Sequence, residues 1–252
     1  MKPAGRAQDG WRARIGLVMP STNTAFESWL PRVAPEGVSF HFGRMPFSRA
    51  TSIESALESM ENEESAAVQQ VMDCEPDVLL FACTASSIVK GVDGDRALIK
   101  RLKEQTKVPC TTITDAIVHA FAQLGTRRIC IASPYPAGLD KLESEFFTAA
   151  GLEVVGIHGL DLSDPADMCD VDPGEIYRFA RSVWNPNAEA LLLSCGAFRG
   201  QSIVAALEQD LGVPVVTSIT ATLWAGLRLA GVMAPVPGFG VLLSQPGRCY
   251  EG

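Results

Sequence analysis

The sequence predicts an α/β protein made of two similar lobes, each built around a parallel β-sheet. Short apolar runs alternate with segments of helical spacing along the 252 residues, which is the pattern of parallel strands connected by helices. One motif also occurs twice: an acidic residue, a short apolar run and a cysteine follow one another at 77–83 and again at 189–195. This repetition predicts an internal duplication, with Cys83 and Cys195 facing each other across the seam.

Two further pairs of segments support the duplication. Residues 14–20 match 128–134, and residues 108–116 match 213–221. The two copies in each pair are separated by nearly the same number of residues as the two cysteine motifs. The apolar runs in these repeated segments have the length of a buried strand. We therefore expect strands, each followed by a helix, at 15–19, 77–82, 128–132 and 190–193.

The repeats also predict the division of the chain. The first lobe is expected to comprise 1–115 together with 222–252, and the second lobe 116–221, which gives each lobe the usual size of a domain. Within the first lobe, 53–71 has the spacing of an amphipathic helix, and its acidic run from Glu54 to Glu64 is expected on a solvated face. In the second lobe, the Pro- and Asp-rich stretch 161–173 predicts a long loop that borders the cleft.

Charge and composition exclude several classes of protein. A net charge of −8 and a pI near 5.0, without a basic stripe, argue against binding to the phosphate backbone of a nucleic acid. No run approaches the roughly 18 apolar residues of a membrane span, and the first residues lack the apolar stretch of a secretory signal. We therefore expect a cytoplasmic protein with neither a membrane nor a nucleic acid as partner.

The sequence also predicts a site without metal or cofactor. His41, His119 and His158 are dispersed, and the seven cysteines include no CxxC pair, which indicates reduced thiols. No GxxxxGK loop occurs, and Gly238 and Gly240 lack the third glycine and the strand-to-helix setting of a dinucleotide motif. Neither ATP nor NAD is expected.

Ligands of open parallel sheets bind beyond the carboxyl ends of the strands. The loop after the first expected strand contains Ser21, Thr22, Asn23 and Thr24, whose side chains, together with free helix N–H groups, suit an anion. The alternative is an ordinary helix cap, which needs only one such side chain. Ser21 and Asn23 are therefore candidate substrate contacts.

Cys83 and Cys195 each end an apolar run, where the N-terminus of a following helix lowers the pKa of a thiol and makes thiolate available. Thr84 and Gly196 come directly after them and are further candidate contacts. The alternative for each cysteine is a small buried hydrophobic residue. Their matched positions favour an acid and a nucleophile or base on opposite sides of a small substrate. The buried structural role is assigned to Cys74, Cys110, Cys130 and Cys169, and no role to Cys249.

Two other side chains lie at expected strand ends. Tyr135 lies between two prolines, where a phenol can be held toward the cleft, although packing within the loop is the alternative. Asp115 lies on a strand-to-helix turn and is expected to cap the helix. A serine hydrolase is not supported, because no GxSxG elbow occurs.

Five short segments follow one another along the chain. They are Pro20 to Thr24 with Glu27, His41 to Met45, Cys83 with Thr84, Pro134 with Tyr135, and Ser194 to Gly196. Together they resemble the maleate cis-trans isomerase and arylmalonate decarboxylase group of the Asp/Glu/hydantoin racemase superfamily. The resemblance extends over nearly the whole chain, from about Arg14 to Leu243.

The resemblance implies two Rossmann-like lobes related by a pseudo-twofold axis, a cofactor-free active site between them, and a small carboxylate substrate. It implies that Cys83 is the thiolate, that Cys195 is the partner acid or base, and that Asn23 and Tyr135 contact a substrate carboxylate. Arylmalonate decarboxylases keep only the second cysteine, so the pair favours an isomerase or racemase. Maleate isomerases carry a substrate-binding Asn in the loop where this chain has Pro165, which argues against maleate itself.

The leading hypothesis is a cofactor-independent isomerase of a small carboxylate, with maleate to fumarate as its concrete form. A racemase of the amino-acid or hydantoin type, with the two thiols as its bases, remains open, as does an arylmalonate-type decarboxylase. A two-lobed small-molecule-binding protein is a further alternative, although it has no need of matched thiols. A homo-oligomer is also expected.

Overall fold

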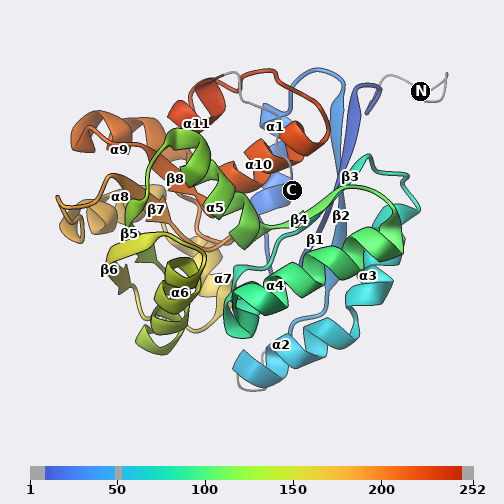
Figure 1. The fold of residues 1–252 in the computed structure, drawn as a ribbon, viewed down its shortest axis with the longest axis horizontal. Helices are drawn as coiled ribbons and strands as arrows, with labels where there is room; N and C mark the ends of the chain where they lie inside the picture. Colours follow the sequence, from blue (N-terminus) through green and yellow to red (C-terminus); the bar gives the residue numbers. More distant parts are fainter. Residues whose placement is uncertain (1–8, 49–52, 246–252) are drawn as a thin grey trace.

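Two four-stranded parallel sheets form the framework of the protein (Figure 1). The computed structural model describes residues 9–48 and 53–245. The strand order of the first sheet is β2-β1-β3-β4 and that of the second is β6-β5-β7-β8, so the same order occurs in both. The predicted α/β class with two parallel-sheet lobes is confirmed.

The strands of the first sheet are β1 (Ala13–Pro20), β2 (Val38–Met45), β3 (Val78–Phe81) and β4 (Cys110–Thr112). Those of the second are β5 (Arg128–Ser133), β6 (Glu153–Gly159), β7 (Ala190–Leu193) and β8 (Val215–Thr217). The four predicted strands correspond to β1, β3, β5 and β7. The edge strands β2 and β6 are mostly half-buried and carry no continuous apolar run, which is why sequence patterning did not predict them.

Helices cover the faces of both sheets, and α5 and α10 lie between them at the centre of the molecule (Figure 1). In the first half of the chain the helices are α1 (Ala25–Val33), α2 (Ile53–Asn62), α3 (Glu64–Met72), α4 (Thr84–Thr106) and α5 (Ile113–Leu124). In the second half they are α6 (Ala137–Ala149), α7 (Pro165–Asp170), α8 (Pro173–Ser182), the 3₁₀-helix η1 (Gly200–Ile203), α9 (Val204–Leu211), α10 (Ser218–Leu229) and α11 (Val241–Ser244). None of the helices within the described ranges is long and apolar enough to cross a membrane.

Several local predictions need correction. The single helix expected over 53–71 is two helices, α2 and α3, and the loop expected over 161–173 contains α7. Glu64 does not lie on a solvated face: it is buried and accepts two hydrogen bonds from Arg101, at 2.8 and 2.9 Å. A buried carboxylate requires such a partner. The side chains of Glu54 and Glu61, and all of Cys249, lie outside the described part of the chain.

The helix α5 is capped by Thr112 and not by Asp115 as predicted. The Thr112 hydroxyl accepts from the Asp115 backbone N–H at 3.2 Å, and Asp115 accepts from Thr111 at 2.6 Å. Thr217 caps α10 in the same way, through the backbone N–H of Thr220 at 2.9 Å. A threonine side chain fits this role at both matched strand ends.

The helix α10 packs closely against the first sheet, although it follows the last strand of the second. A Cβ atom at Gly226 would lie 2.8 Å from Leu80 Cδ1 and 3.2 Å from Ile15 Cγ2, and both of these side chains are buried. This contact agrees with a return of the chain to the first lobe, but the exact division at 115 and 222 stays a prediction.

We expect Gly226→Ala to lower the free energy of unfolding by about 1 to 3 kcal/mol, because the added methyl group overpacks a filled interface. The matched control is Gly138→Ala in α6, where nothing lies within 4 Å of the added Cβ. That change removes a helical glycine and should be neutral or stabilising by up to about 1 kcal/mol. Chemical denaturation measures both variants, and equal stability of the two would contradict the packing of α10.

Candidate active site

One pocket contains both of the matched cysteines. It lies beyond the carboxyl ends of β1, β3, β5 and β7, where ligands of parallel sheets bind. Cys83 enters it from the first sheet and Cys195 from the second. The predicted contacts Asn23, Thr84, Tyr135 and Gly196 also line this pocket. The fold therefore brings six of the seven predicted site residues to one place.

Ser21 is the predicted contact that does not line the pocket. Its side chain is directed elsewhere, because Ser21 Oγ accepts a hydrogen bond from the backbone N–H of Phe47 at 3.0 Å. The residue is exposed. Ser21 thus connects two loops of the first lobe, and Phe47 itself lines the pocket.

The backbone around Cys83 favours negative charge on its sulfur. Cys83 precedes the first turn of α4, so its side chain lies at the positive end of the helix dipole. Ser86, one turn into the helix, donates a hydrogen bond from Oγ to Cys83 Sγ at 3.1 Å. Both features stabilise a thiolate, and they support the role of nucleophile predicted for this residue.

The surroundings of Cys195 instead favour the neutral thiol. Burial raises the pKa of its thiol to about 12, although hydrogen bonds from the Tyr135 hydroxyl and the Ala197 backbone N–H act in the other direction. The predicted lowering of the pKa at this position is wrong, because a loop follows β7 before the short η1 and no long helix begins at Cys195. The thiol is therefore protonated at neutral pH and has a proton to donate.

Tyr135 lies beside Cys195 in the pocket wall. It is 3% exposed, and burial, followed by the proximity of Cys195, raises the pKa of its phenol well above the usual range. The phenol is therefore neutral and a hydrogen-bond donor at any physiological pH.

Two hydroxyl groups in the pocket have no hydrogen-bond partner among the described residues. Thr22 Oγ1 and Thr84 Oγ1 are both buried atoms, and both residues line the pocket. Buried hydroxyls are normally satisfied, so these two are suited to donate to a bound anion. Thr84 was predicted as a contact. Thr22 was not, because a run of four polar residues does not reveal which one points inward.

Asn23 joins the two halves of the site. Its Nδ2 donates to the Gly196 carbonyl at 2.9 Å, while its Oδ1 accepts from the N–H groups of Ala25 and Phe26 at 2.9 and 3.2 Å. The second N–H of the amide remains for a ligand. Gly196 itself has no room for a side chain, since a Cβ would lie 2.8 Å from Phe26 Cε2.

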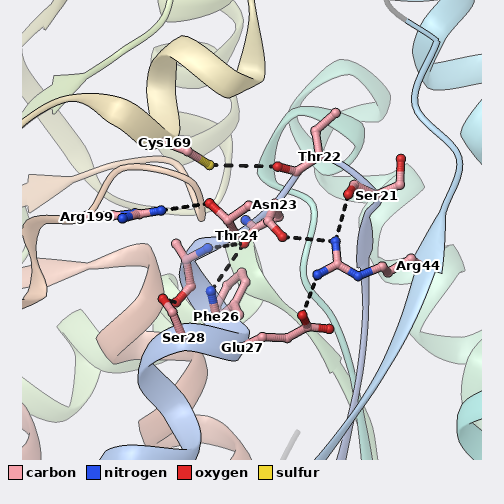
Figure 2. A network of polar contacts seen from close by, with 11 residues as sticks. Ser21, Thr22, Asn23, Thr24, Phe26, Glu27, Ser28, Arg44, Cys169 and Arg199 are labelled. Carbon is pink, nitrogen blue, oxygen red and sulfur yellow. Dashed lines mark hydrogen bonds and ion pairs between the residues drawn. The ribbon is translucent and has the colours of Figure 1, made fainter.

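The loop that carries Asn23 is fixed from both lobes (Figure 2). Arg44 Nη1 donates to the carbonyls of Ser21 and Asn23 at 2.7 and 3.1 Å, and the same guanidinium pairs with Glu27. From the second lobe, Arg199 Nη2 donates to Thr24 Oγ1 at 2.7 Å. Cys169, assigned a purely structural role above, also reaches this loop, with its sulfur 4.0 Å from the Thr22 carbonyl.

Part of the pocket lining is apolar. Its side chains come from α2, α6, the segment 161–170, which also contributes the polar Ser163, and the loop after β2. The resemblance had indicated Pro165, whereas the other apolar residues belong to no recognisable site motif and were missed by sequence reasoning. The segment 161–170 does border the cleft, as predicted. These residues are Phe47, Leu57, Met60, Leu139, Pro165 and Met168. Within the described ranges no cluster of three His, Cys, Asp or Glu side chains is able to hold a metal ion.

Comparison with known proteins agrees with this architecture. The family model described as arylmalonate decarboxylase matches residues 15–243. The chain belongs to this family. The resemblance noted from the sequence motifs is thereby confirmed.

Within the arylmalonate decarboxylase family, the chain is similar to maleate isomerases over most of its length. It is 30% identical to the maleate isomerase of Pseudomonas putida, over 92% of this chain and 97% of the relative. It is also 30% identical to the arylmalonate decarboxylase of Bordetella bronchiseptica, over 64% and 69%.

Solved structures of the family have the same fold. A variant maleate isomerase of P. putida S16 with maleate superimposes with a TM-score of 0.87 and 25% identity, covering 93% of this chain and 98% of the other. A cysteine-to-serine variant of the maleate cis-trans isomerase of Nocardia farcinica, with a covalently bound succinylcysteine intermediate, gives 0.86 and 26%, covering 92% and 98%.

We expect Asn23→Asp to lower the free energy of unfolding by about 1 to 3 kcal/mol, because it removes the donor to the buried Gly196 carbonyl and places a carboxylate against it. The acceptors for the N–H groups of Ala25 and Phe26 remain. Denaturant unfolding compares it with Asn187→Asp on an exposed turn, which should stay within about 0.5 kcal/mol of the wild type. Equal effects of both substitutions would show that the bond from Asn23 to Gly196 contributes nothing.

Proposed function

We propose that the protein is a cofactor-independent cis-trans isomerase of a small unsaturated carboxylate, with Cys83 as the nucleophile and Cys195 as the acid and base. The observation that carries the proposal is the pair of thiols from matched strand ends in one pocket, in opposite electrostatic settings. The relatives support it, since the chain is similar to maleate isomerases over most of its length and a variant of one of them carries a covalently bound succinylcysteine intermediate.

The reaction begins when the Cys83 thiolate adds to one alkene carbon. Cys195 gives its proton to the other alkene carbon, so the double bond becomes a single bond in a saturated thioether. That bond rotates. The Cys195 thiolate then takes a proton back, the C–S bond breaks, and the trans alkene forms as Cys83 recovers its electron pair. No atom or electron is gained or lost overall.

The two ends of the pocket suit different parts of the substrate. Thr22 Oγ1, Thr84 Oγ1 and the second N–H of Asn23 supply hydrogen-bond donors for one carboxylate, whereas the single Tyr135 O–H donates to Cys195, so that a contact from Tyr135 to the carboxylate stays a prediction. The apolar side chains of the lining and Pro165 offer no donor to a second carboxylate, and Ser163 carries the one hydroxyl in their part of the lining. The substrate proposed here therefore has one carboxylate and an uncharged group at its other end. The homo-oligomeric state stays a prediction.

Decarboxylation of a substituted malonate is the second candidate. The apolar wall favours it, since a malonate with an apolar substituent would place that substituent there. This reaction needs only one proton donor on the enolate formed after loss of CO₂, and Cys195 is sufficient for that step. It differs from isomerisation in having no use for Cys83.

We expect Cys83→Ala and Cys195→Ala each to lower kcat/KM for isomerisation by on the order of 10³-fold or more, because the thiols act as a unit. The double variant should be little worse than either single one. Cys130→Ala, at a buried position in β5, is the matched control and should change stability only. The difference in ultraviolet absorbance between the cis and trans alkenes and the exchange of deuterium from solvent measure turnover. Full activity of Cys83→Ala with release of CO₂ from phenylmalonate would favour the decarboxylase instead.

We expect maleate to be a poor substrate and monoethyl maleate a better one. A hydrogen bond to a charged group contributes about 1.5 to 3 kcal/mol, so the missing donor at Pro165 costs maleate roughly one to two decades in kcat/KM. The monoester keeps the activated alkene and places an uncharged ethyl ester against the apolar wall. Proton NMR measures both reactions. A kcat/KM for maleate at or above ~10⁴ M⁻¹s⁻¹, an ordinary enzyme value, would contradict the argument from Pro165.

A further inference from the structure

A buried carboxyl group lies directly behind the proposed acid and takes no part in the mechanism above. Glu143, in α6, is 0% exposed. Ser194 Oγ donates a hydrogen bond to Glu143 Oε1, while Glu143 Oε2 has no hydrogen-bond partner among the described residues. Burial of a carboxyl group with only one hydrogen-bonded oxygen lowers the free energy of unfolding. Its presence next to Cys195 therefore needs a physical reason.

The backbone of Cys195 is strained. Its φ angle is +83°, in a region that residues with a side chain rarely adopt, and such strain persists only where the surroundings enforce it. Three hydrogen bonds hold the adjoining backbone and side chain. Ser194 N–H donates to the Ala132 carbonyl at 3.0 Å, Asn23 donates to the Gly196 carbonyl, and the Ser194 hydroxyl donates to Glu143.

The first lobe provides an internal comparison. In the repeat, Ala82 occupies the position of Ser194, directly before the cysteine, so no hydroxyl is present there. Cys83 has an ordinary extended φ of −130°. The hydroxyl and its buried carboxyl partner thus occur at the matched strand end where the cysteine is strained, and are missing where it is relaxed.

We propose that Glu143 is a positioning residue, which accepts the hydrogen bond from Ser194 and thereby fixes the strained backbone of Cys195 in the orientation needed for proton transfer. This inference rests on the proposed role of Cys195 as the acid. Glu143 does not line the pocket and therefore acts through Ser194.

The charge state of Glu143 agrees with this role. Burial raises its pKa to about 8 and Asp140 acts in the same direction, while the Ser194 hydrogen bond opposes them. The carboxyl group is therefore neutral at pH 7, and its ionisation would place a negative charge near Tyr135 and Cys195, with which it interacts electrostatically. The other charged groups toward this end of α6, α4 and β6 are the buried Asp95 and a set of exposed side chains, namely Lys141, Glu145, Lys90, Asp93 and His158.

The test compares Glu143→Gln with Glu143→Leu. The Gln variant keeps an acceptor for Ser194 and is always neutral, so kcat at pH 7 should stay within about threefold of the wild type. The Leu variant leaves the buried Ser194 hydroxyl without an acceptor, and kcat should fall about 10- to 100-fold with KM little changed. Glu145→Gln, on the exposed face of the same helix, is the matched control and should equal the wild type.

The pH profile separates positioning from simple packing. Wild-type kcat should fall as pH rises through about 8, because Glu143 ionises there, and this fall should be absent in Glu143→Gln. Stability gives the same information without turnover. The folded pKa lies above the ordinary value of 4.5, so the wild type should lose stability relative to Glu143→Gln between about pH 4.5 and 8. Denaturant midpoints measure this loss.

A third readout keeps the inference separate from the proposed reaction. Mass spectrometry after iodoacetamide treatment gives the alkylation rates of Cys195 and Cys83 individually. Glu143→Leu should change the Cys195 rate about tenfold or more and leave the Cys83 rate unchanged. If no substrate is turned over, the isomerase proposal fails while this result still decides the role of Glu143. Equal Cys195 rates in Glu143→Leu and the wild type, or identical pH dependence of stability in Glu143→Gln and the wild type, would overturn it.

Discussion

The candidate site depends on the side chain of Asn23, which makes buried hydrogen bonds to both lobes. The amide oxygen of Asn23 caps α1 in the first lobe, and its N–H reaches the Gly196 carbonyl in the second. Because both hydrogen bonds are buried, removing either one would leave an unpaired polar group and lower the free energy of unfolding. This constraint fixes the loop between β1 and α1 against the strand end that carries Cys195. The shared pocket exists because the two lobes meet at this point.

The duplicated halves have diverged in their electrostatics. At the end of β3 the first segment of α4, which runs to a kink at Gly91, begins directly after Cys83, and its dipole and the Ser86 hydroxyl favour a thiolate. At the end of β7 a loop follows, and the buried Cys195 keeps its proton. A symmetric pair of thiols would suit two equivalent proton transfers. This unequal pair suits a nucleophile working with an acid.

The pocket also divides into two chemical halves. One half consists of the hydroxyl and amide donors of Thr22, Thr84 and Asn23, and the other of apolar side chains from α2, α6 and the segment around α7, among which Ser163 is polar. A carboxylate loses little on entering the first half, because hydrogen bonds replace its water shell. In the second, only the Ser163 hydroxyl offers such compensation. The substrate preference therefore depends on the elements that supply the apolar lining of the pocket, and not on the strand-end motifs.

The sequence by itself determined the α/β class, the duplication and the strand ends that carry Cys83 and Cys195, because buried parallel strands need continuous apolar runs and those runs repeat. It also indicated Asn23, Thr84, Tyr135 and Gly196, since each lies within a few residues of the end of such a run. Only the tertiary structure decided that Ser21 points away, that Thr22 points inward, and that Cys195 is a protonated thiol with strained backbone. Apolar wall residues such as Met60 and Met168, and the carboxyl group of Glu143, were likewise beyond sequence reasoning. Their roles depend on contacts between segments far apart in the chain, and burial and pKa are properties of that assembled environment.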